Sequence, residues 1–149
     1  MKLDLVQLKI VKESVLEYNT ALSSPEAAFE MLRGLIGDSD RESGVVICLD
    51  SKNRPTSVQI VSTGSINSSI MHPREVFKCA VLSNSTSIII GHNHPSGDLT
   101  PSPDDIEITK KLLEAGRILG IRLQDHLILS PSDYRSLRES NIRGLSWTA

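Results

Sequence analysis

The sequence is poor in aromatic residues and carries little net charge. Aromatic side chains make up 3% of its 149 residues, so the core must be aliphatic, and a surface that stacks on single-stranded nucleic-acid bases is not expected. Sixteen basic against eighteen acidic side chains give a formal net charge of −2, which is not typical of a protein that binds phosphate backbones. We therefore expect direct DNA binding to be weak or absent.

Cysteine and long apolar runs are also scarce. Cys48 and Cys79 lie in separate apolar segments without a CxxC pattern, which excludes a disulfide framework and suits a reducing cytoplasm. No run approaches the roughly 20 apolar residues of a spanning helix, and the charged N-terminal segment is atypical of a secretory signal. With 39% hydrophobic and 23% charged residues, we expect a cytoplasmic protein with no membrane segment and one packed domain over residues 1–149.

Apolar segments with strand character alternate with segments that carry helix signals. Ser24 and His72 each precede a proline, which is favoured at the first helical position, and Gly120 ends a third helical segment. The turn-rich residues 50–55 separate two apolar strands, which predicts a hairpin and makes an all-parallel sheet implausible. We expect an α/β domain with a mixed sheet flanked by helices, with strands at residues 5–11, 45–49, 57–62, 87–91 and 123–129 and helices at residues 25–36, 73–81 and 103–119.

Two histidines at the end of one predicted strand indicate a metal site. His92 and His94 are two residues apart, so their side chains leave the same face of the strand and can reach one ion at about 2.0–2.1 Å. Asp105, in the first turn of the next helix, supplies a third ligand and leaves a fourth position open for water, the arrangement of a catalytic zinc. Ser102-x-x-Asp105 is also an ordinary capping box, and an isolated HxH is weakly informative. Their conjunction favours the metal.

The combined pattern resembles a known family. His92-Asn93-His94-Pro95, followed after six residues by Ser102-Pro103-Asp104-Asp105, resembles the motif of the JAMM (JAB/MPN) metalloproteases. The chain is more closely similar to their RadC-like branch, in which the middle residue is Asn, as Asn93 is here. The resemblance covers residues 5–138 and includes the segments Gly64-Ser65-Ile66-Asn67, His72-Pro73-Arg74-Glu75-Val76 and Asp125-His126-Leu127-Ile128.

The resemblance implies a JAB/MPN-type fold, one zinc ion per chain and hydrolysis of a peptide or isopeptide bond in a protein or peptide substrate. It implies His92, His94 and Asp105 as metal ligands and Ser102 as the donor to the oxyanion. It also implies an upstream acidic residue at the start of a strand as general base, and Glu42 occupies that position. The other acidic candidates are Glu30, Asp50 and Glu75, of which Glu75 fits better as a charge at a helix N-terminus.

Two alternatives belong to other functional classes. The first is a non-catalytic interaction module that keeps the fold, although the complete set of ligands and catalytic candidates favours the enzyme. The second is a DNA-repair-associated factor, as the RadC-like name suggests. RadC-like proteins often carry an N-terminal helix-hairpin-helix domain, and the 41 residues before Glu42 are too few for one. We therefore expect the catalytic module without that domain.

Several remaining residues have open interpretations. His126 is expected to be a hydrogen-bonded histidine of the sheet, with a place beside the metal site as the alternative. The basic residues Lys110, Lys111, Arg117 and Arg122 are expected to form solvated surface, with a partner-binding face as the alternative. An edge strand at residues 5–11 would allow a homodimer. The sequence identifies no particular substrate.

Overall fold

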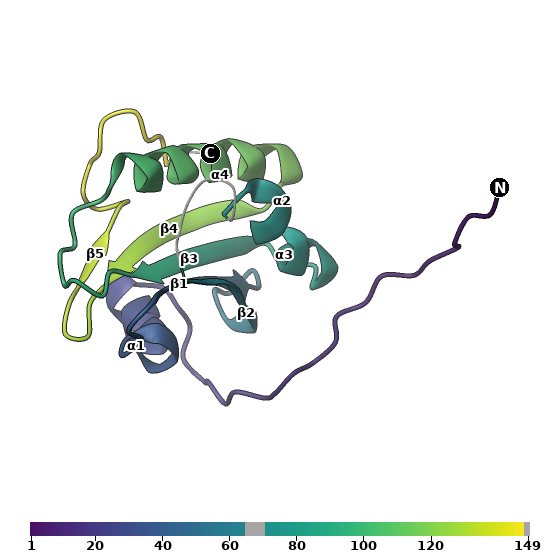
Figure 1. Ribbon diagram of the computed structural model, residues 1–149, viewed down its shortest axis with the longest axis horizontal. Helices are drawn as coiled ribbons and strands as arrows, with labels where there is room; N and C mark the ends of the chain where they lie inside the picture. The colour runs from purple at the N-terminus through teal and green to yellow at the C-terminus, as the bar shows by residue number, and fades with distance from the viewer. Residues whose placement is uncertain (65–70, 148–149) are drawn as a thin grey trace.

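The computed structural model describes residues 1–64 and 71–147, and the Ser65–Asn67 part of the resemblance lies outside these residues. One mixed sheet of five strands, in the order β2-β1-β3-β4-β5, forms its centre (Figure 1). The predicted fold class, a mixed sheet flanked by helices, is confirmed. The strands are β1 (Glu42–Leu49), β2 (Pro55–Gly64), β3 (Ser87–Asn93), β4 (Arg122–Leu129) and β5 (Tyr134–Ser136), and the helices are α1 (Pro25–Ile36), α2 (Pro73–Val76), α3 (Lys78–Leu82) and α4 (Pro103–Leu119).

The pairing of the strands brings distant parts of the chain to one end of the sheet. β1 runs antiparallel to both β2 and β3, and β5 runs antiparallel to β4. β3 and β4 are parallel, which requires a crossover, and α4 supplies it. The start of β1 therefore lies beside the end of β3, with Gly44 opposite His92, close to the point where the chain leaves the sheet toward α4.

Helices cover both faces of the sheet, and the central strands are buried on both sides. Along β1, Val45 and Ile47 pack in the core beneath α1, whereas Val46 and Cys48 pack in the core beneath α4. This period of two, with apolar residues on both faces, explains the continuous β-branched runs of β1 and β3. In Figure 1, α1 lies on one side of the sheet and α4 on the other.

Near the start of β4, the side chains change the face of the sheet to which they point. Leu123 packs in the core on the α4 side of the sheet. The register with β3 then skips Gln124: Ile88 lies opposite Leu123, and the next residue, Ile89, lies opposite Asp125. This bulge turns the following residues over, and Leu127 packs beneath α1 instead. His126, next to Leu127, consequently faces α4.

Most predicted helix boundaries agree with the structure. The Ser24 side chain accepts a hydrogen bond at the start of α1, and Nδ1 of His72 accepts one from the Arg74 backbone at the start of α2. Gly120 ends α4 in the left-handed conformation, with φ of 71°, where a side chain would be strained. The helix predicted over residues 73–81 is instead two short helices, which meet at Phe77.

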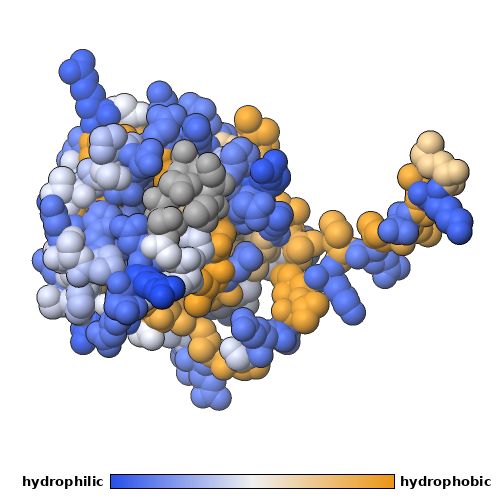
Figure 2. Space-filling model, viewed as in Figure 1, coloured by the Kyte–Doolittle hydropathy of each residue, from blue (hydrophilic) through white to orange (hydrophobic). Residues whose placement is uncertain are grey.

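The strand predicted at residues 5–11 is wrong. These residues extend away from the domain as an arm whose apolar side chains are exposed, Leu5 by 102% and Leu8 by 78% (Figures 1 and 2). Their alternation is only partial, so no single face could bury all the apolar side chains, and the sheet of the described residues offers them no neighbouring strand. Conversely, β5 was not predicted, because three residues are too few to show a period.

None of the described helices is both long enough and apolar enough to cross a membrane.

Candidate metal centre

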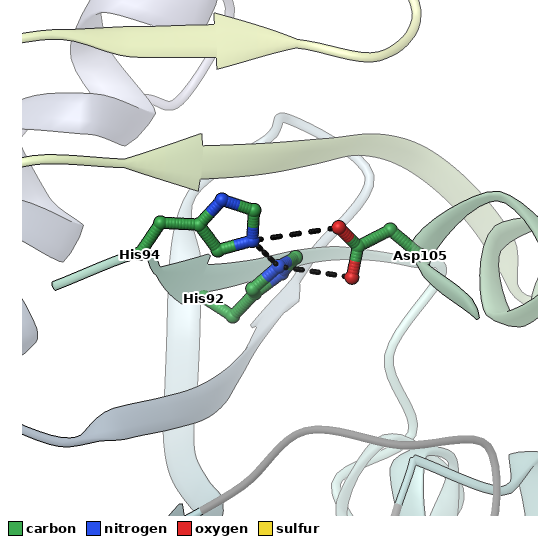
Figure 3. Close-up of side chains that lie close together, drawn as sticks. All are labelled: His92, His94 and Asp105. Atoms are coloured by element: carbon green, nitrogen blue, oxygen red, sulfur yellow. Dashed lines mark hydrogen bonds and ion pairs between the residues drawn. The ribbon is translucent and has the colours of Figure 1, made fainter. Parts of the chain in front are cut away.

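Three side chains converge where β3 ends and α4 begins (Figure 3). His92 Nε2 lies 3.0 Å from His94 Nε2 and 3.2 Å from Asp105 Oδ1, and His94 Nε2 lies 3.4 Å from Asp105 Oδ2. His92 is the sixth residue of β3, His94 follows that strand, and Asp105 lies in the first turn of α4. The structure thus brings together the three residues that the sequence predicts as ligands.

The donor chemistry of this cluster fits a metal ion. The three ligand atoms all lie within 4.8 Å of one another, so the His-His-Asp cluster could hold one ion. Two imidazole nitrogens with one carboxylate oxygen suit zinc and related transition metals. His92 and Asp105 are both buried, which gives the site rigid walls on the protein side, and His94 is partly exposed toward solvent.

The cluster keeps Asp105 ionised. Burial by itself would raise the pKa of Asp105, but hydrogen bonds with His92 and His94, the charge of His92 and a hydrogen bond from the Ser102 backbone together hold it well below its usual range. The hydrogen bond with Asp105 in turn raises the pKa of His94 against the opposing effect of burial, and the nearby Glu42 charge contributes to that rise. An ionised carboxylate is therefore available as a ligand for a cation.

Ser102 and Asp105 form a reciprocal capping box at the start of α4. The Asp105 backbone N–H donates to Ser102 Oγ at 3.1 Å, and the Ser102 backbone N–H donates to Asp105 Oδ2 at 2.8 Å. Asp105 Oδ1 remains directed at His92. The capping and metal interpretations of the Ser-x-x-Asp pattern are therefore compatible, and the cap fixes the carboxylate in its orientation.

A pocket of about 690 Å³ opens over His94 and Asp105. Glu42, the first residue of β1, and Ser102 line it, so both predicted catalytic candidates share the pocket with His94 and Asp105. The described lining consists of Asp40, Arg41, Glu42, Gly64, His94, Pro95, Ser96, Asp98, Thr100, Ser102 and Asp105.

The alternative acidic candidates are not in this lining. Glu30, Asp50 and Glu75 instead form ion pairs on the surface, with Arg33, Arg54 and Lys78 respectively. Of the four acids that the sequence offers, the structure brings only Glu42 to the pocket.

Asn93, between the two histidines, holds the segment that carries Glu42. Its Oδ1 accepts from the backbone N–H of Ser43 at 2.7 Å, and its Nδ2 donates to the carbonyl oxygens of Arg41 at 2.8 Å and Ser39 at 3.3 Å. Asn93 is buried, and its three partners flank Glu42 on both sides. Sequence reasoning missed this role, because these contacts span about 50 residues of chain.

His126 lies directly behind His92. Its Nε2 is 2.8 Å from His92 Nδ1, and its Nδ1 is 2.6 Å from Thr109 Oγ1. His126 is therefore a hydrogen-bonded histidine of the sheet, as expected, and it also lies beside the candidate metal site, as the alternative had it. Complete burial lowers the pKa of His126 well below its usual value, and a neutral ring is the result. Thr109 was not singled out from the sequence, since a threonine inside an amphipathic helix carries no distinguishing signal.

The predicted basic stretch is exposed on or just after α4. Lys110 and Lys111 lie on the solvent side of the helix, and Lys111 is 4.0 Å from Glu107. Arg117 donates to the carbonyl of Ser146 at 2.5 Å, which ties the C-terminal segment to the helix. These residues lie outside the described lining of the pocket.

Comparison with known proteins agrees with this architecture. Residues 22–142 match the family described as the RadC-like JAB domain. A UPF0758 protein of Methanosarcina barkeri is 43% identical over 116 residues, which cover 78% of this chain and 51% of the relative. A UPF0758 protein of Caldanaerobacter subterraneus is 46% identical over 121 residues, or 81% of this chain and 52% of the relative. The chain thus spans about half the length of these relatives, and their names state no activity. By fold, motif and similarity, the chain belongs to the RadC-like JAB domain family.

Proposed function

We propose that this chain is a zinc-dependent metallopeptidase of the JAMM type that hydrolyses a peptide or isopeptide bond. The observation that carries the proposal is the convergence of His92, His94 and Asp105, of which His94 and Asp105 line a pocket together with Glu42 and Ser102. A structural zinc site is closed by four protein ligands, whereas three ligands beside an open pocket leave room for water and substrate.

The residues would divide the work as follows. His92 Nε2, His94 Nε2 and the Asp105 carboxylate would hold the ion, and the capping box would keep that carboxylate in place. When bound, zinc would act as a Lewis acid on the scissile carbonyl and lower the pKa of a water molecule toward about 7.

Glu42 and Ser102 would act on the reacting groups. Glu42 would accept the proton of the attacking water and return it to the leaving amine, which requires a carboxylate within about 2.6–3.2 Å of each in turn. Ser102 Oγ accepts from the Asp105 N–H, so its own hydrogen can be donated to the carbonyl oxygen as that atom gains negative charge.

The pocket favours a polypeptide over a nucleic acid as its ligand. Asp40, Glu42, Asp98 and Asp105 contribute four carboxylates to the described lining, against the single guanidinium of Arg41. A bound zinc ion would reduce this excess of negative charge without cancelling it, since four negative charges would face three positive ones. The remaining negative charge disfavours phosphate groups, whereas a peptide carries no such charge along its backbone. The substrate class we propose is therefore a protein or peptide.

Metal analysis tests the ligand set. Protein purified without chelator should contain about one zinc per chain, and Asp105→Asn should lose most of it. Asparagine can still accept from the Ser102 N–H, so this variant keeps the helix cap while it removes the negative charge. Asp104→Asn is the matched control, since it changes the same charge at an exposed position in the same turn and should keep its zinc. Full zinc in Asp105→Asn would refute the ligand assignment.

A second comparison tests catalysis and identifies a substrate. Glu42→Gln should keep its zinc and lose about 10²–10⁴-fold in hydrolysis, because general acid–base catalysis contributes about that much. Proteins cleaved in cells that express the wild type, but intact in cells that express Glu42→Gln, are candidate substrates. Glu107→Gln, on the exposed side of α4, is the control and should cleave the same proteins. Identical cleavage by Glu42→Gln and the wild type would refute the assignment of Glu42. If zinc is bound and neither protein cleaves anything, the chain is an interaction module.

A further inference from the structure

A chain of hydrogen bonds runs from the candidate metal centre into the core and returns to it. His92 Nδ1 contacts His126 Nε2 at 2.8 Å, His126 Nδ1 contacts Thr109 Oγ1 at 2.6 Å, and Thr109 Oγ1 contacts the Asp105 carbonyl at 2.7 Å. All four residues are buried, Thr109 completely. The chain therefore begins and ends on candidate ligands, yet the proposed reaction uses neither His126 nor Thr109.

The donor and the acceptor of each hydrogen bond in this chain can be derived by starting at the Asp105 carbonyl. The Asp105 carbonyl oxygen can only accept, so the single hydroxyl hydrogen of Thr109 is donated to it. Thr109 Oγ1 has no second hydrogen and must accept from His126 Nδ1, which therefore carries a proton. The His126 ring is buried, and its two nitrogens contact Thr109 Oγ1 and His92 Nδ1 rather than a carboxylate, so it holds the single proton at Nδ1. His126 Nε2 is then an acceptor, and the proton between the two rings belongs to His92 Nδ1.

We propose that Thr109 and His126 are positioning residues that fix the tautomer of His92. With its proton held at Nδ1, His92 presents the lone pair of Nε2 to the metal site, the form in which an imidazole binds a metal. The reverse polarity would place a hydrogen on Nε2 and block that lone pair. The importance of this effect for zinc rests on the proposed function, whereas the tautomer itself does not.

The second histidine reaches the same state by a different contact. His94 Nδ1 lies 2.6 Å from the Asp98 carbonyl, which can only accept, so the neutral ring of His94 also has its lone pair on Nε2. The two lone pairs then face each other across 3.0 Å and cannot form a hydrogen bond. Both Nε2 atoms also face the Asp105 carboxylate, at 3.2 and 3.4 Å, which can only accept. The hydrogen bonds to Asp105 therefore form only while Nε2 carries a second proton, and a metal ion between these atoms would take the place of that proton.

Two features of the fold build the chain of bonds. Thr109 follows Asp105 by one helical turn on α4, so its hydroxyl reaches the carbonyl four residues earlier. The bulge at Gln124 turns His126 toward α4, and the parallel register places His126 beside β3 within reach of His92. The loop that orients His94 is exposed, whereas the partners that orient His92 are wholly internal.

Nuclear magnetic resonance reads the tautomers directly. Long-range ¹H–¹⁵N spectra of protein with ¹⁵N-labelled histidines, at mildly alkaline pH, show which ring nitrogen carries the proton. We expect the proton of His126 on Nδ1 with or without zinc, and the proton of His92 on Nδ1 in the zinc-loaded protein. His72 is an internal control with the opposite tautomer. Its Nδ1 accepts from the Arg74 N–H, so the proton of the neutral ring must lie on Nε2. A His126 proton on Nε2 would overturn the proposal.

A pair of variants separates positioning from simple packing. Thr109→Val keeps the shape of the side chain and removes the hydroxyl, and we expect zinc affinity, measured by competition with a chromogenic chelator, to fall about 10–100-fold. Thr109→Ser restores the hydroxyl and should stay within about threefold of the wild type. If Thr109→Val lowers the melting temperature but leaves both the zinc affinity and the His126 spectrum unchanged, Thr109 only packs, and the proposal is overturned.

A wild-type protein without zinc affinity would refute the proposed function, while the His126 spectrum would still decide the tautomer.

Discussion

Replacing Asn93 should uncouple the proposed general base from the metal centre. In Asn93→Ala the buried N–H of Ser43 loses its acceptor, and the carbonyls of Ser39 and Arg41 lose their donor. An unsatisfied buried N–H costs about 1–3 kcal/mol, and the two carbonyls add about 0.5–1 kcal/mol together because they lie near the surface and water can replace the amide. We expect the free energy of unfolding in urea to fall by about 1.5–4 kcal/mol.

The same variant should lose hydrolysis while it keeps its zinc. The backbone on both sides of Glu42 is held by Asn93, and a shift of about 1 Å in a catalytic group can cost about 10²-fold in rate. The three ligands stay on β3 and α4, so metal content should remain near one per chain. The assay is the turnover of a substrate identified by the Glu42→Gln comparison, together with zinc content.

Ser83→Ala is a control, because the Ser83 hydroxyl is also hydrogen-bonded, to the Cys79 carbonyl at 2.8 Å and to Ser85 Oγ at 2.7 Å, away from the pocket. It should lose stability but not turnover. Wild-type stability in Asn93→Ala would refute the hydrogen-bond reasoning. A joint loss of zinc and turnover would show that Asn93 supports the ligands rather than Glu42.

The stability of Asn93→Asp relative to the wild type should depend on pH. The introduced carboxylate can still accept from the Ser43 N–H, but its second oxygen would face the carbonyl of Arg41, now 2.8 Å from the amide nitrogen. Two acceptors at that distance repel, so the pKa of the introduced group should be raised in the folded state. The variant should therefore be least stable relative to the wild type at neutral pH, and the deficit should shrink as pH falls and the group is protonated. A deficit that grows on acidification would contradict this account.

Three further predictions test the surrounding fold. Removal of residues 1–16 should change the free energy of unfolding by less than about 0.5 kcal/mol, because the arm is exposed, and a larger loss would mean that it packs on the domain. Gly91→Ala should cost about 1–3 kcal/mol in urea unfolding, since the added Cβ would lie 2.5 Å from Leu32 Cδ1 in a filled core; an unchanged midpoint would show that α1 can shift. At pH near 8, Ellman's reagent should titrate at most one thiol in the native protein and two after denaturation, because burial raises the pKa of Cys48 to about 11 and leaves only Cys79 accessible. The folded chain then holds the Cys48 proton longer than the unfolded chain, so stability should fall as pH rises from about 8.5 to 11, and a rise would contradict the assignment.

The three candidate ligands could be predicted from the sequence because they belong to one strand–loop–helix unit. The strand period sets the relation of His92 to His94, and the capping signal sets the position of Asp105. Both are local patterns, and both agree with the structure. Glu42 is different: its place at the pocket depends on the antiparallel pairing of β1 with β3, and the residues alone left Glu30, Asp50 and Glu75 as competitors. Only the resemblance to a family distinguished Glu42.

The role of His126 could not be predicted, because it depends on one unpaired residue. Leu123, Leu127 and Leu129 follow a strict period of two, which in a regular strand would place all three on one face and His126 on the other. That pattern gives no sign that Leu123 packs beneath α4 and Leu127 beneath α1. The bulge at Gln124 reconciles the two, because skipping one residue inverts every side chain that follows. Without it, a strand anchored by Leu123 would turn His126 away from α4, and His92 would lose the partner that holds its proton. The candidate ligand set is therefore encoded locally, whereas the tautomer that we propose for His92 depends on the register of β4 against β3.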